Sequence, residues 1–210
     1  MTSGILSDRA ILAAVTQGDI EIDPFDHAGV KSERRGQLQT GSYDLTLGDG
    51  VAVYDRWVHT LREETAERVK DGSALSPLNR ELDIKEEPTV TRFTIDKNVG
   101  WLLKPGIGYL MHTRERVHTK KFIPVLDGRS SIGRLFISVH ATAGYGDAGF
   151  DGQYTLEVTV QHSIRVYADM RIAQMRFHTM VGEPLRLYDG NYRGEASRGP
   201  VASRAWKMFR

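Results

Sequence analysis

Two groups of polar residues in the second half of the chain have the types and spacing needed for chemistry on a phosphorylated small molecule. The first is the stretch Gly128-Arg129-Ser130-Ser131-Ile132-Gly133-Arg134, and the second is a glycine-rich turn at 142–152 followed by Glu157. Guanidinium and hydroxyl groups bind phosphate oxygens well. A glutamate among apolar neighbours can act as a general base. Together the two groups predict a binding site for a phosphorylated ligand.

The arginine–serine block does not have the G-x-x-x-x-G-K-[ST] spacing of a P-loop. We expect residues 129–134 to begin a short helix, where free backbone amides add to the arginines and form an anion cradle. A capped surface helix without a ligand explains the same residues equally well. The residues alone leave both interpretations open.

Glu157 lies on a predicted strand at 154–160 whose alternation places Thr155, Glu157 and Thr159 on one face and apolar residues on the other. An exposed acid at a sheet edge is one interpretation of this pattern. A buried Glu157 would instead have a raised pKa, which suits a general base near neutral pH.

The glycine-rich turn before that strand lets the backbone approach a ligand closely. Within it, Asp147 offers an acceptor for a hydroxyl group and Phe150 offers an apolar platform for a sugar. A tight turn that only connects two strands is the alternative interpretation.

The composition is that of an ordinary globular protein of 210 residues, with 40% hydrophobic and 26% charged residues. A net charge of +1 gives no overall attraction to nucleic acid. Apolar runs are too short to span a membrane, and no signal-peptide segment is present. We therefore expect a cytoplasmic protein without nucleic-acid or membrane partners.

The chain contains no cysteine, which excludes disulfides and thiol catalysis. The zinc site of the common deaminases needs a cysteine pair and is excluded for the same reason. The seven histidines do not lie at close metal-ligand spacing, so we expect no metal bound directly by the protein.

The elements that position these residues are mostly short strands. Ser7 as N-cap and Gly18 at the end predict one N-terminal helix, and Gly48-Asp49-Gly50 predicts a hairpin turn. The charge-rich residues 58–88 predict an insertion with a short helix around 61–69. Alternation predicts further strands, at 20–22, 43–47, 51–54, 93–95, 107–112, 122–126, 135–140, 154–160, 163–167 and 172–178. This pattern predicts a single domain built as a β-sandwich or barrel.

The order of the motifs resembles the dCTP deaminase family of the dUTPase-like superfamily. The resembling segments follow family order over nearly the whole chain, and 58–88 matches least. They are Leu6-Ser7-Asp8-Arg9, Ile22-Asp23-Pro24-Phe25, Ser42-Tyr43-Asp44-Leu45-Thr46-Leu47-Gly48, 128–134, 140–152, Leu156-Glu157 and Gly199-Pro200-Val201-Ala202-Ser203-Arg204. The resemblance implies a mainly β, distorted β-barrel or jelly-roll subunit with few helices. It also implies a closing tail at about 188–210 and a homotrimer with active sites between subunits.

The resemblance further implies hydrolytic deamination of dCTP to dUTP and ammonia without zinc, with Mg²⁺ arriving on the nucleotide. Glu157 takes a proton from water and the hydroxide attacks C4 of cytosine, while Ser130 and Arg134 orient the reacting groups. Arg129 and Ser131 bind phosphates across the interface. The substrate-binding residues implied are Arg129, Ser131, Ile132, Gly133, Thr142, Ala143, Asp147, Phe150, Thr155, Leu156, Tyr188, Asn191 and Glu195.

Glu157 separates the chain from plain dUTPases, which by resemblance have no such glutamate. Thr142-Ala143-Gly144-Tyr145 resembles members that continue from dCTP to dUMP and diphosphate, supplying dUMP for dTTP synthesis. We expect Gly144 to leave room that a histidine fills in strictly deaminating members.

Three residues depart from the family pattern. Asn191 replaces a lysine, Glu195 replaces a glutamine, and Gly146 stands where relatives usually carry an apolar residue. Three alternatives therefore stay open: a dUTPase-like phosphohydrolase, a deaminase of a modified or less phosphorylated deoxycytidine nucleotide, and a catalytically silent nucleotide-binding regulator.

Overall fold

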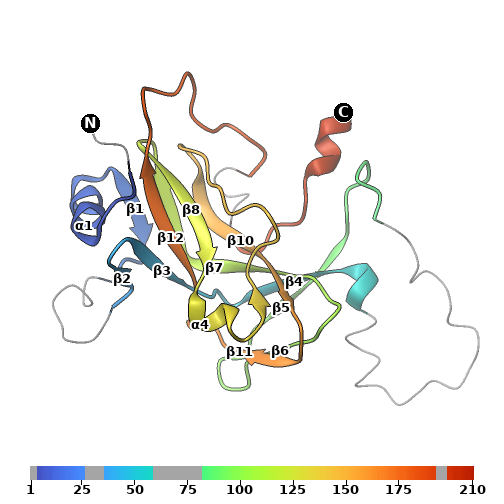
Figure 1. Ribbon diagram of the computed structural model, residues 1–210. Coiled ribbons are helices and arrows are strands. Elements are labelled where there is room, and N and C mark those ends of the chain that lie inside the picture. Colours follow the sequence, from blue (N-terminus) through green and yellow to red (C-terminus); the bar gives the residue numbers. More distant parts are fainter. Residues whose placement is uncertain (1–3, 27–35, 59–81, 193–197) are drawn as a thin grey trace, which may run out of the picture.

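The computed structural model describes residues 4–26, 36–58, 82–192 and 198–210, and the described chain is mainly β, as predicted (Figure 1). Every strand pairing among these residues is antiparallel. The elements are α1 (Asp8–Gln17), β1 (Ile20–Asp23), β2 (Leu38–Gln39), β3 (Ser42–Thr46), β4 (Gly50–Tyr54), β5 (Val90–Thr94), β6 (Trp101–Leu103), β7 (Tyr109–Thr119), β8 (Phe122–Gly128), α4 (Ser130–Gly133), β9 (Ile137–Ser138), β10 (Asp151–Val160), β11 (Ile164–Val166), β12 (Arg171–Thr179) and the 3₁₀ helix η2 (Ala205–Phe209).

Two larger sheets form the body of the described chain. One has the order β5-β4-β7-β10-β9, with β1 also pairing with β7, and the other has the order β2-β3-β12-β8. A small sheet of β6 and β11 completes the set. Buried side chains from both larger sheets form one core, which includes Tyr43, Met111, Leu156 and Phe177. The long central strands β7 and β10 carry most of the residues discussed below.

Helix α1 forms where the sequence predicts it. The Ser7 side chain accepts a hydrogen bond from Ala10 N at 3.4 Å, and Gly18 ends the helix with a φ of 78°. A positive φ suits glycine because it has no Cβ. Ile11 and Ala14 are buried in the core. The predicted N-cap and the predicted glycine at the end of the helix are therefore confirmed.

The predicted hairpin at 48–50 is wrong, because β3 and β4 belong to different sheets. The turn instead wraps around His112 of β7: Gly48 N donates to the carbonyl of His112 at 2.8 Å. A Cβ on Gly48 would lie 2.1 Å from the His112 ring. The glycine is required by this close approach rather than by a hairpin.

One further expectation differs from the structure, and another falls on residues that the structure does not describe. The predicted strand at 135–140 is reduced to β9, because Leu135 and Phe136 continue the turns after α4 and Phe136 has a φ of 55°. The proposed helix at 61–69, with most of the insertion, lies outside the described residues. No helix within the described ranges is long and apolar enough to cross a membrane.

Candidate functional site

A cavity of about 500 Å³ lies between the start of β10, the turn that precedes it and the C-terminal segment. It contains the carboxylates of Glu157 and Asp147 but, among the described residues, no lysine, arginine or histidine in its lining. The lining residues are Tyr54, Leu110, Ala143, Tyr145, Gly146, Asp147, Phe150, Gln153, Tyr154, Thr155, Glu157, Tyr188, Tyr192, Val201 and Ser203. Six of the predicted site residues line this cavity: Ala143, Asp147, Phe150, Thr155, Glu157 and Tyr188.

Glu157 is half-buried on β10, and its carboxylate is held by a backbone amide. Ala141 N donates to Glu157 Oε2 at 2.9 Å, and the Glu157 amide itself donates to the Val139 carbonyl at 3.1 Å. Residues 139–141 therefore run beside β10. The amide fixes one carboxylate oxygen, so the group is oriented and charge-stabilised, while the second oxygen has no partner within the described chain.

The turn ahead of β10 pairs with β8 rather than projecting into solvent. Leu126 N donates to the Gly144 carbonyl at 2.7 Å, and Gly146 N donates to the Pro124 carbonyl at 2.8 Å. A Cβ on Gly144 would lie 2.4 Å from the Leu126 oxygen. The expectation that Gly144 leaves room for a larger side chain is therefore wrong, because the neighbouring backbone occupies that space.

Phe150 sits between two tyrosine rings at the other end of the cavity. Its ring centroid is 4.9 Å from that of Tyr154 and 5.8 Å from that of Tyr188, both at steep interplanar angles. Gly149, with a φ of 94°, lets the chain turn toward Phe150 and approach the 187–188 segment. Edge-to-face contacts of this kind give the ring a fixed orientation. Phe150 therefore presents a rigid apolar surface beside Asp147.

The C-terminal segment lies along the open side of this cavity. Gly199 N donates to Gln153 Oε1 at 2.7 Å, Val201 N to Thr155 Oγ1 at 3.1 Å and Ser203 N to the Tyr54 hydroxyl at 3.2 Å. Each of these bonds joins a tail amide to a side chain of β4 or β10. Val201 and Ser203 therefore line the cavity of their own subunit, and closure of the tail on a ligand stays a prediction.

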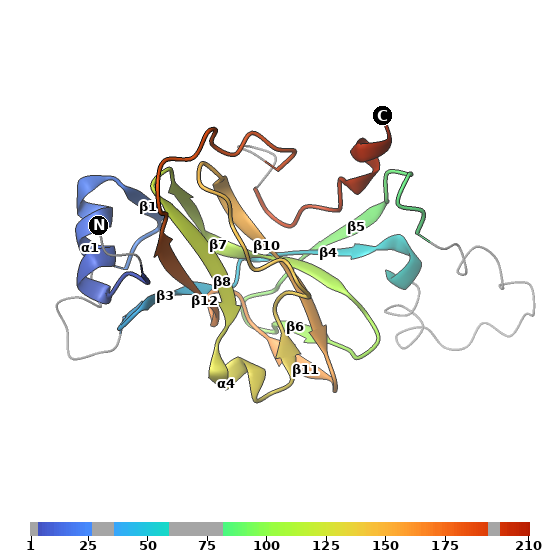
Figure 2. The same ribbon diagram turned by 45° about the horizontal axis from the view of Figure 1, so that its top comes forward.

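The arginine–serine block, residues 129–134, does not border this cavity. It forms the four-residue helix α4, where Ser130, Ser131, Gly133 and Arg134 are exposed and none lines the cavity. Figures 1 and 2 show α4 and the C-terminal segment at opposite ends of the molecule. Arg129 is held by the buried carboxylate of Asp44, with Nε 3.1 Å from Oδ1. One subunit therefore does not bring the two predicted halves of the site together.

The remaining predicted residues occupy varied positions. Ile132 is buried beneath α4, and Leu156 is fully buried in the core. Thr142 and Asn191 are exposed and do not line the cavity, and the Asn191 carbonyl accepts a hydrogen bond from the Arg204 guanidinium. Glu195 lies outside the described residues.

Sequence reasoning missed several residues that line the cavity. Tyr145, Tyr192, Val201 and Ser203 belong to segments already singled out, but no spacing rule identified them individually. Tyr54 and Leu110 come from distant strands and carried no sequence signal. Tyr154 was assigned to the apolar face of its strand. The unusual glycine at 146 was a signal for it, because the Tyr154 side chain occupies the space beside that glycine.

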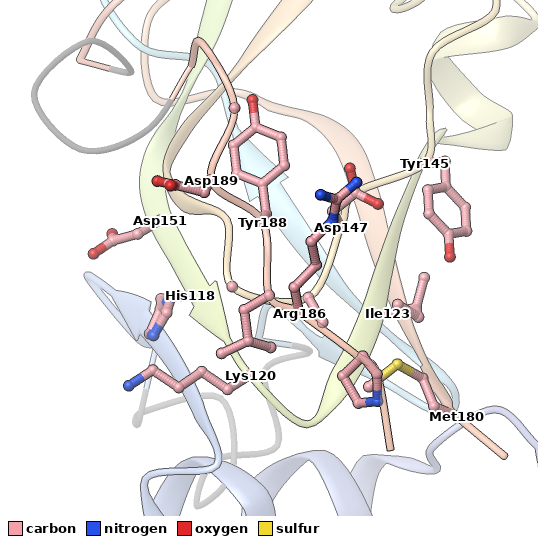
Figure 3. A pocket seen from close by; sticks show the side chains of 15 residues that line it. His118, Lys120, Ile123, Tyr145, Asp147, Asp151, Met180, Arg186, Tyr188 and Asp189 are labelled. Atoms are coloured by element: carbon pink, nitrogen blue, oxygen red, sulfur yellow. The ribbon is translucent and has the colours of Figure 1, made fainter. Parts of the chain in front are cut away.

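A larger cavity of about 1130 Å³ adjoins the first and shares Tyr145, Asp147 and Tyr188 with it. Figure 3 shows Asp151 and Asp189 on one side of this cavity and Tyr145 on the other, with Asp147 and Tyr188 between them. Lys120 and Arg186 also line it. Side chains of both charges therefore surround the space beyond Tyr188.

No group of three or more histidine, aspartate or glutamate side chains within the described ranges is arranged to hold a metal ion. Asp147 and Glu157 both line the cavity, but they are not part of such a cluster. A divalent cation that enters on a nucleotide fits this arrangement, because phosphate oxygens and water are the ligands that Mg²⁺ prefers.

Known proteins resemble this chain over almost its whole length. The family model for dCTP deaminase-like proteins matches residues 5–180. The "dCTP deaminase, dUMP-forming" of Leptospira biflexa is 35% identical, covering 98% of both chains. The protein of the same name from Cytophaga hutchinsonii is 36% identical, covering 91% of both.

A solved structure supports the fold. The 2′-deoxycytidine 5′-triphosphate deaminase of Agrobacterium tumefaciens matches with a TM-score of 0.57 and 23% identity, over 86% of this chain. This chain spans about half, 49%, of the length of that one. With the family match and the near-complete relatives, these findings show that the chain belongs to the dCTP deaminase-like family.

Proposed function

We propose that this protein deaminates dCTP hydrolytically and then hydrolyses the dUTP formed to dUMP and diphosphate. The observation that carries the proposal is the position of Glu157, an oriented carboxylate in the wall of a nucleotide-sized cavity that also contains Asp147 and Phe150. The relatives named as dUMP-forming deaminases support both steps. The dUMP produced supplies dTTP synthesis.

Glu157 is the general base of the first step. Water is a poor nucleophile at neutral pH, so a positioned base must take its proton as the oxygen attacks C4. The attack moves the C4=N3 electron pair onto N3. Glu157 then returns the proton to the amino group, the C4–N bond breaks as ammonia leaves, and the proton of the new C4 hydroxyl moves to N3 to give the uracil ring. The Ala141 amide keeps one carboxylate oxygen fixed, which leaves the other to handle the proton. No metal-bound water enters this scheme.

Asp147 and Phe150 bind the sugar. The Asp147 carboxylate accepts a hydrogen bond from the 3′-hydroxyl, and the fixed Phe150 ring packs against the deoxyribose. Because Tyr154 and Tyr188 pack against Phe150 from two sides, moving the Phe150 ring costs energy. The fixed ring leaves no room for a 2′-hydroxyl and therefore favours deoxyribose.

A second subunit supplies the cations. A triphosphate needs positive partners, yet the described lining of the cavity has no lysine or arginine. The exposed α4 block provides them in a homotrimer, with Arg129 and Ser131 toward the phosphates and Ser130 and Arg134 toward the reacting base. Mg²⁺ bound to the phosphates lowers their negative charge when the nucleotide enters.

The test is product analysis with the pure protein, dCTP and Mg²⁺, measuring ammonia, diphosphate and nucleotide together. We expect one ammonia and one diphosphate for each dUMP formed. The Glu157→Gln variant keeps the shape of the side chain but loses the base, so ammonia release should fall at least about 100-fold. Unchanged thermal unfolding of the variant is the control for folding.

Each other outcome identifies an alternative. Ammonia without diphosphate limits the enzyme to dUTP formation, and diphosphate from dUTP without ammonia from dCTP identifies a phosphohydrolase. Ammonia from dCMP but not dCTP moves the substrate to a less phosphorylated nucleotide. Tight dCTP binding without product identifies a silent regulator. Full activity of Glu157→Gln would refute the proposed base.

A further inference from the structure

Gly146 and Tyr154 share one space in the wall of the cavity. A Cβ on Gly146 would lie 2.4 Å from the Tyr154 hydroxyl oxygen and 2.9 Å from Pro124 Cγ. Real Cβ atoms essentially never approach other heavy atoms this closely. The tip of the tyrosine therefore occupies the position where a side chain at 146 would begin.

The backbone does not require glycine at this position. Gly146 is absent from the glycines with positive φ, in contrast to Gly149 in the same turn at 94°. A residue with a side chain could adopt the Gly146 conformation without backbone strain. Space explains the glycine: the Tyr154 hydroxyl is the nearest group, and Pro124 Cγ and the Pro124 carbonyl oxygen follow at 2.9 and 3.0 Å.

The Tyr154 hydroxyl makes no hydrogen bond within the described chain, although the oxygen is buried. Burial raises the pKa of this phenol above its usual value, and the nearby Asp147 charge adds to the effect. A buried tyrosine hydroxyl normally finds a partner. The buried hydroxyl does not reach the cavity, so Tyr154 acts through packing rather than through a polar contact with a ligand.

The ring of Tyr154 links the two groups that face the sugar. Its hydroxyl tip abuts Gly146, which precedes Asp147 in the chain, and its ring lies edge-to-face with Phe150 at 4.9 Å between centroids. The Tyr154 amide donates to Thr113 Oγ1 at 2.9 Å, which ties the residue to β7. The tyrosine is therefore a rigid brace between the central sheet and the turn.

We propose that Tyr154 is a positioning residue for the sugar end of a deoxynucleotide: the tip of its side chain fills the space left at Gly146, its ring packs on Phe150, and together these contacts hold Asp147 and Phe150 in place. This inference rests on the proposed function, which gives Asp147 and Phe150 their roles. Tyr154 itself need not contact the nucleotide, and Glu157 lies outside the brace.

The test is a double-mutant cycle of Gly146→Ala and Tyr154→Leu. In the wild-type background the added methyl group collides with the ring and displaces Asp147, so KM for dCTP should rise about tenfold. In the Tyr154→Leu background only the contacts with Pro124 remain, so the same change should raise KM less than in wild type, by about threefold or less. The effect should fall on KM rather than kcat, because Glu157 is not displaced.

Tyr154→Phe separates the ring from the hydroxyl. It keeps the ring beside Phe150 and removes the unpaired oxygen that abuts Gly146, so its KM should lie below that of Tyr154→Leu and its Tm should rise by up to about 4 °C. A KM for Tyr154→Phe as high as that of Tyr154→Leu would mean that the ring does not hold the turn, which overturns the proposal.

Thermal unfolding without substrate gives a second reading of the cycle. If the Tm change of the double variant differs from the sum of the two single changes, Gly146 and Tyr154 share one space. If the two changes add, they do not. Equal effects of Gly146→Ala on KM in both backgrounds, or an effect on kcat alone, also refute the positioning role. A wild-type protein that releases no ammonia from dCTP refutes the proposed function instead, while the unfolding cycle still tests the Gly146–Tyr154 pair.

Discussion

Asp44 is the buried charge on which the arginine–serine block depends. It is only 1% exposed, and its two oxygens accept from Arg129 Nε at 3.1 Å and Arg171 NH1 at 3.3 Å. A buried carboxylate is tolerated only when it is paired and hydrogen-bonded. The pairing fixes the base of the Arg129 side chain while Ser130 and Arg134 stay open to solvent.

We expect Asp44→Asn to lower the free energy of unfolding by about 2–3 kcal/mol, because two partly buried guanidinium groups lose their counter-charge. Urea denaturation measures this change. The matched control is Asp169→Asn, which breaks the exposed pair with Arg114 at 2.7 Å and should cost less than about 1 kcal/mol. Equal losses in the two variants would contradict the burial argument.

The sequence predicted those site residues whose signal is local. Asp147, Phe150 and Glu157 lie within eleven residues of one another, and the structure places all three in one cavity. The partnership of Asp44 with Arg129 joins residues 85 positions apart, and no pattern in either segment indicates it. Tyr154 was missed because alternation describes the faces of a strand, whereas its ring reaches past the edge of the face to Gly146.

At the scale of elements, His112 joins β7 to the turn before β4. Its Nε2 accepts from Gly50 N at 3.1 Å, so the proton is on Nδ1, which donates to the Thr113 carbonyl at 2.9 Å. This arrangement requires a neutral ring. Desolvation lowers the pKa of His112 below its ordinary value of 6.5. Protonation would remove the acceptor for Gly50.

A lowered pKa in the folded state means that the unfolded chain binds the proton more readily. The contribution of the neutral His112 ring to the free energy of unfolding is fully present above about pH 6.5 and is lost as the pH falls below that value. We expect the free energy of unfolding to fall less steeply over this range in His112→Gln than in wild type. The control is His162→Gln at an exposed histidine, which should show the same pH dependence of the unfolding free energy as wild type. Equal pH dependence in His112→Gln and wild type would contradict the assignment of this effect to His112.

The hold of β10 on the C-terminal segment can be tested through Thr155. Thr155→Val removes the acceptor of the Val201 amide, and the loss of about 1 kcal/mol should raise the open population of the segment about fivefold. Trypsin cleavage after Arg198 and Arg204 measures that opening. Thr159→Val, on the same face of the strand but away from the segment, is the control. Equal cleavage rates in the two variants would show that this bond does not hold the tail.

Periodicity predicted most strands but not the sheet to which each belongs. Alternating residues identify a strand with one buried face, and β1, β8, β10, β11 and β12 all form where expected. Sheet membership depends on distant partners: β3 pairs with β12, whereas β4 pairs with β5 and β7. The short turn between β3 and β4 therefore resembles a hairpin in sequence while it connects two sheets.

At the scale of the whole molecule, the proposed site is divided within one subunit between the cavity and the exposed residues of and after α4. The cavity has two carboxylates and no cation in its described lining, whereas α4 presents Arg134 and two serines to solvent. Large apolar side chains are also exposed, including Phe136 beside α4 and Val181 and Leu185 after β12. We expect light scattering to give about 71 kDa, three times the chain mass of 23.6 kDa.

Intersubunit sites make a specific prediction about mixed oligomers. Glu157→Gln and Arg134→Ala should each be nearly inactive alone. A trimer that contains both variants has sites in which intact Glu157 of one subunit meets intact Arg134 of another, so co-refolding equal amounts should restore about a quarter of wild-type activity. Mixing Ser130→Ala with Arg134→Ala, which damages the same helix in both chains, should restore none. Because no residue of α4 lines the Glu157 cavity in one subunit, failure of the first mixture to recover activity would mean that this chain completes its site without α4 of a second copy.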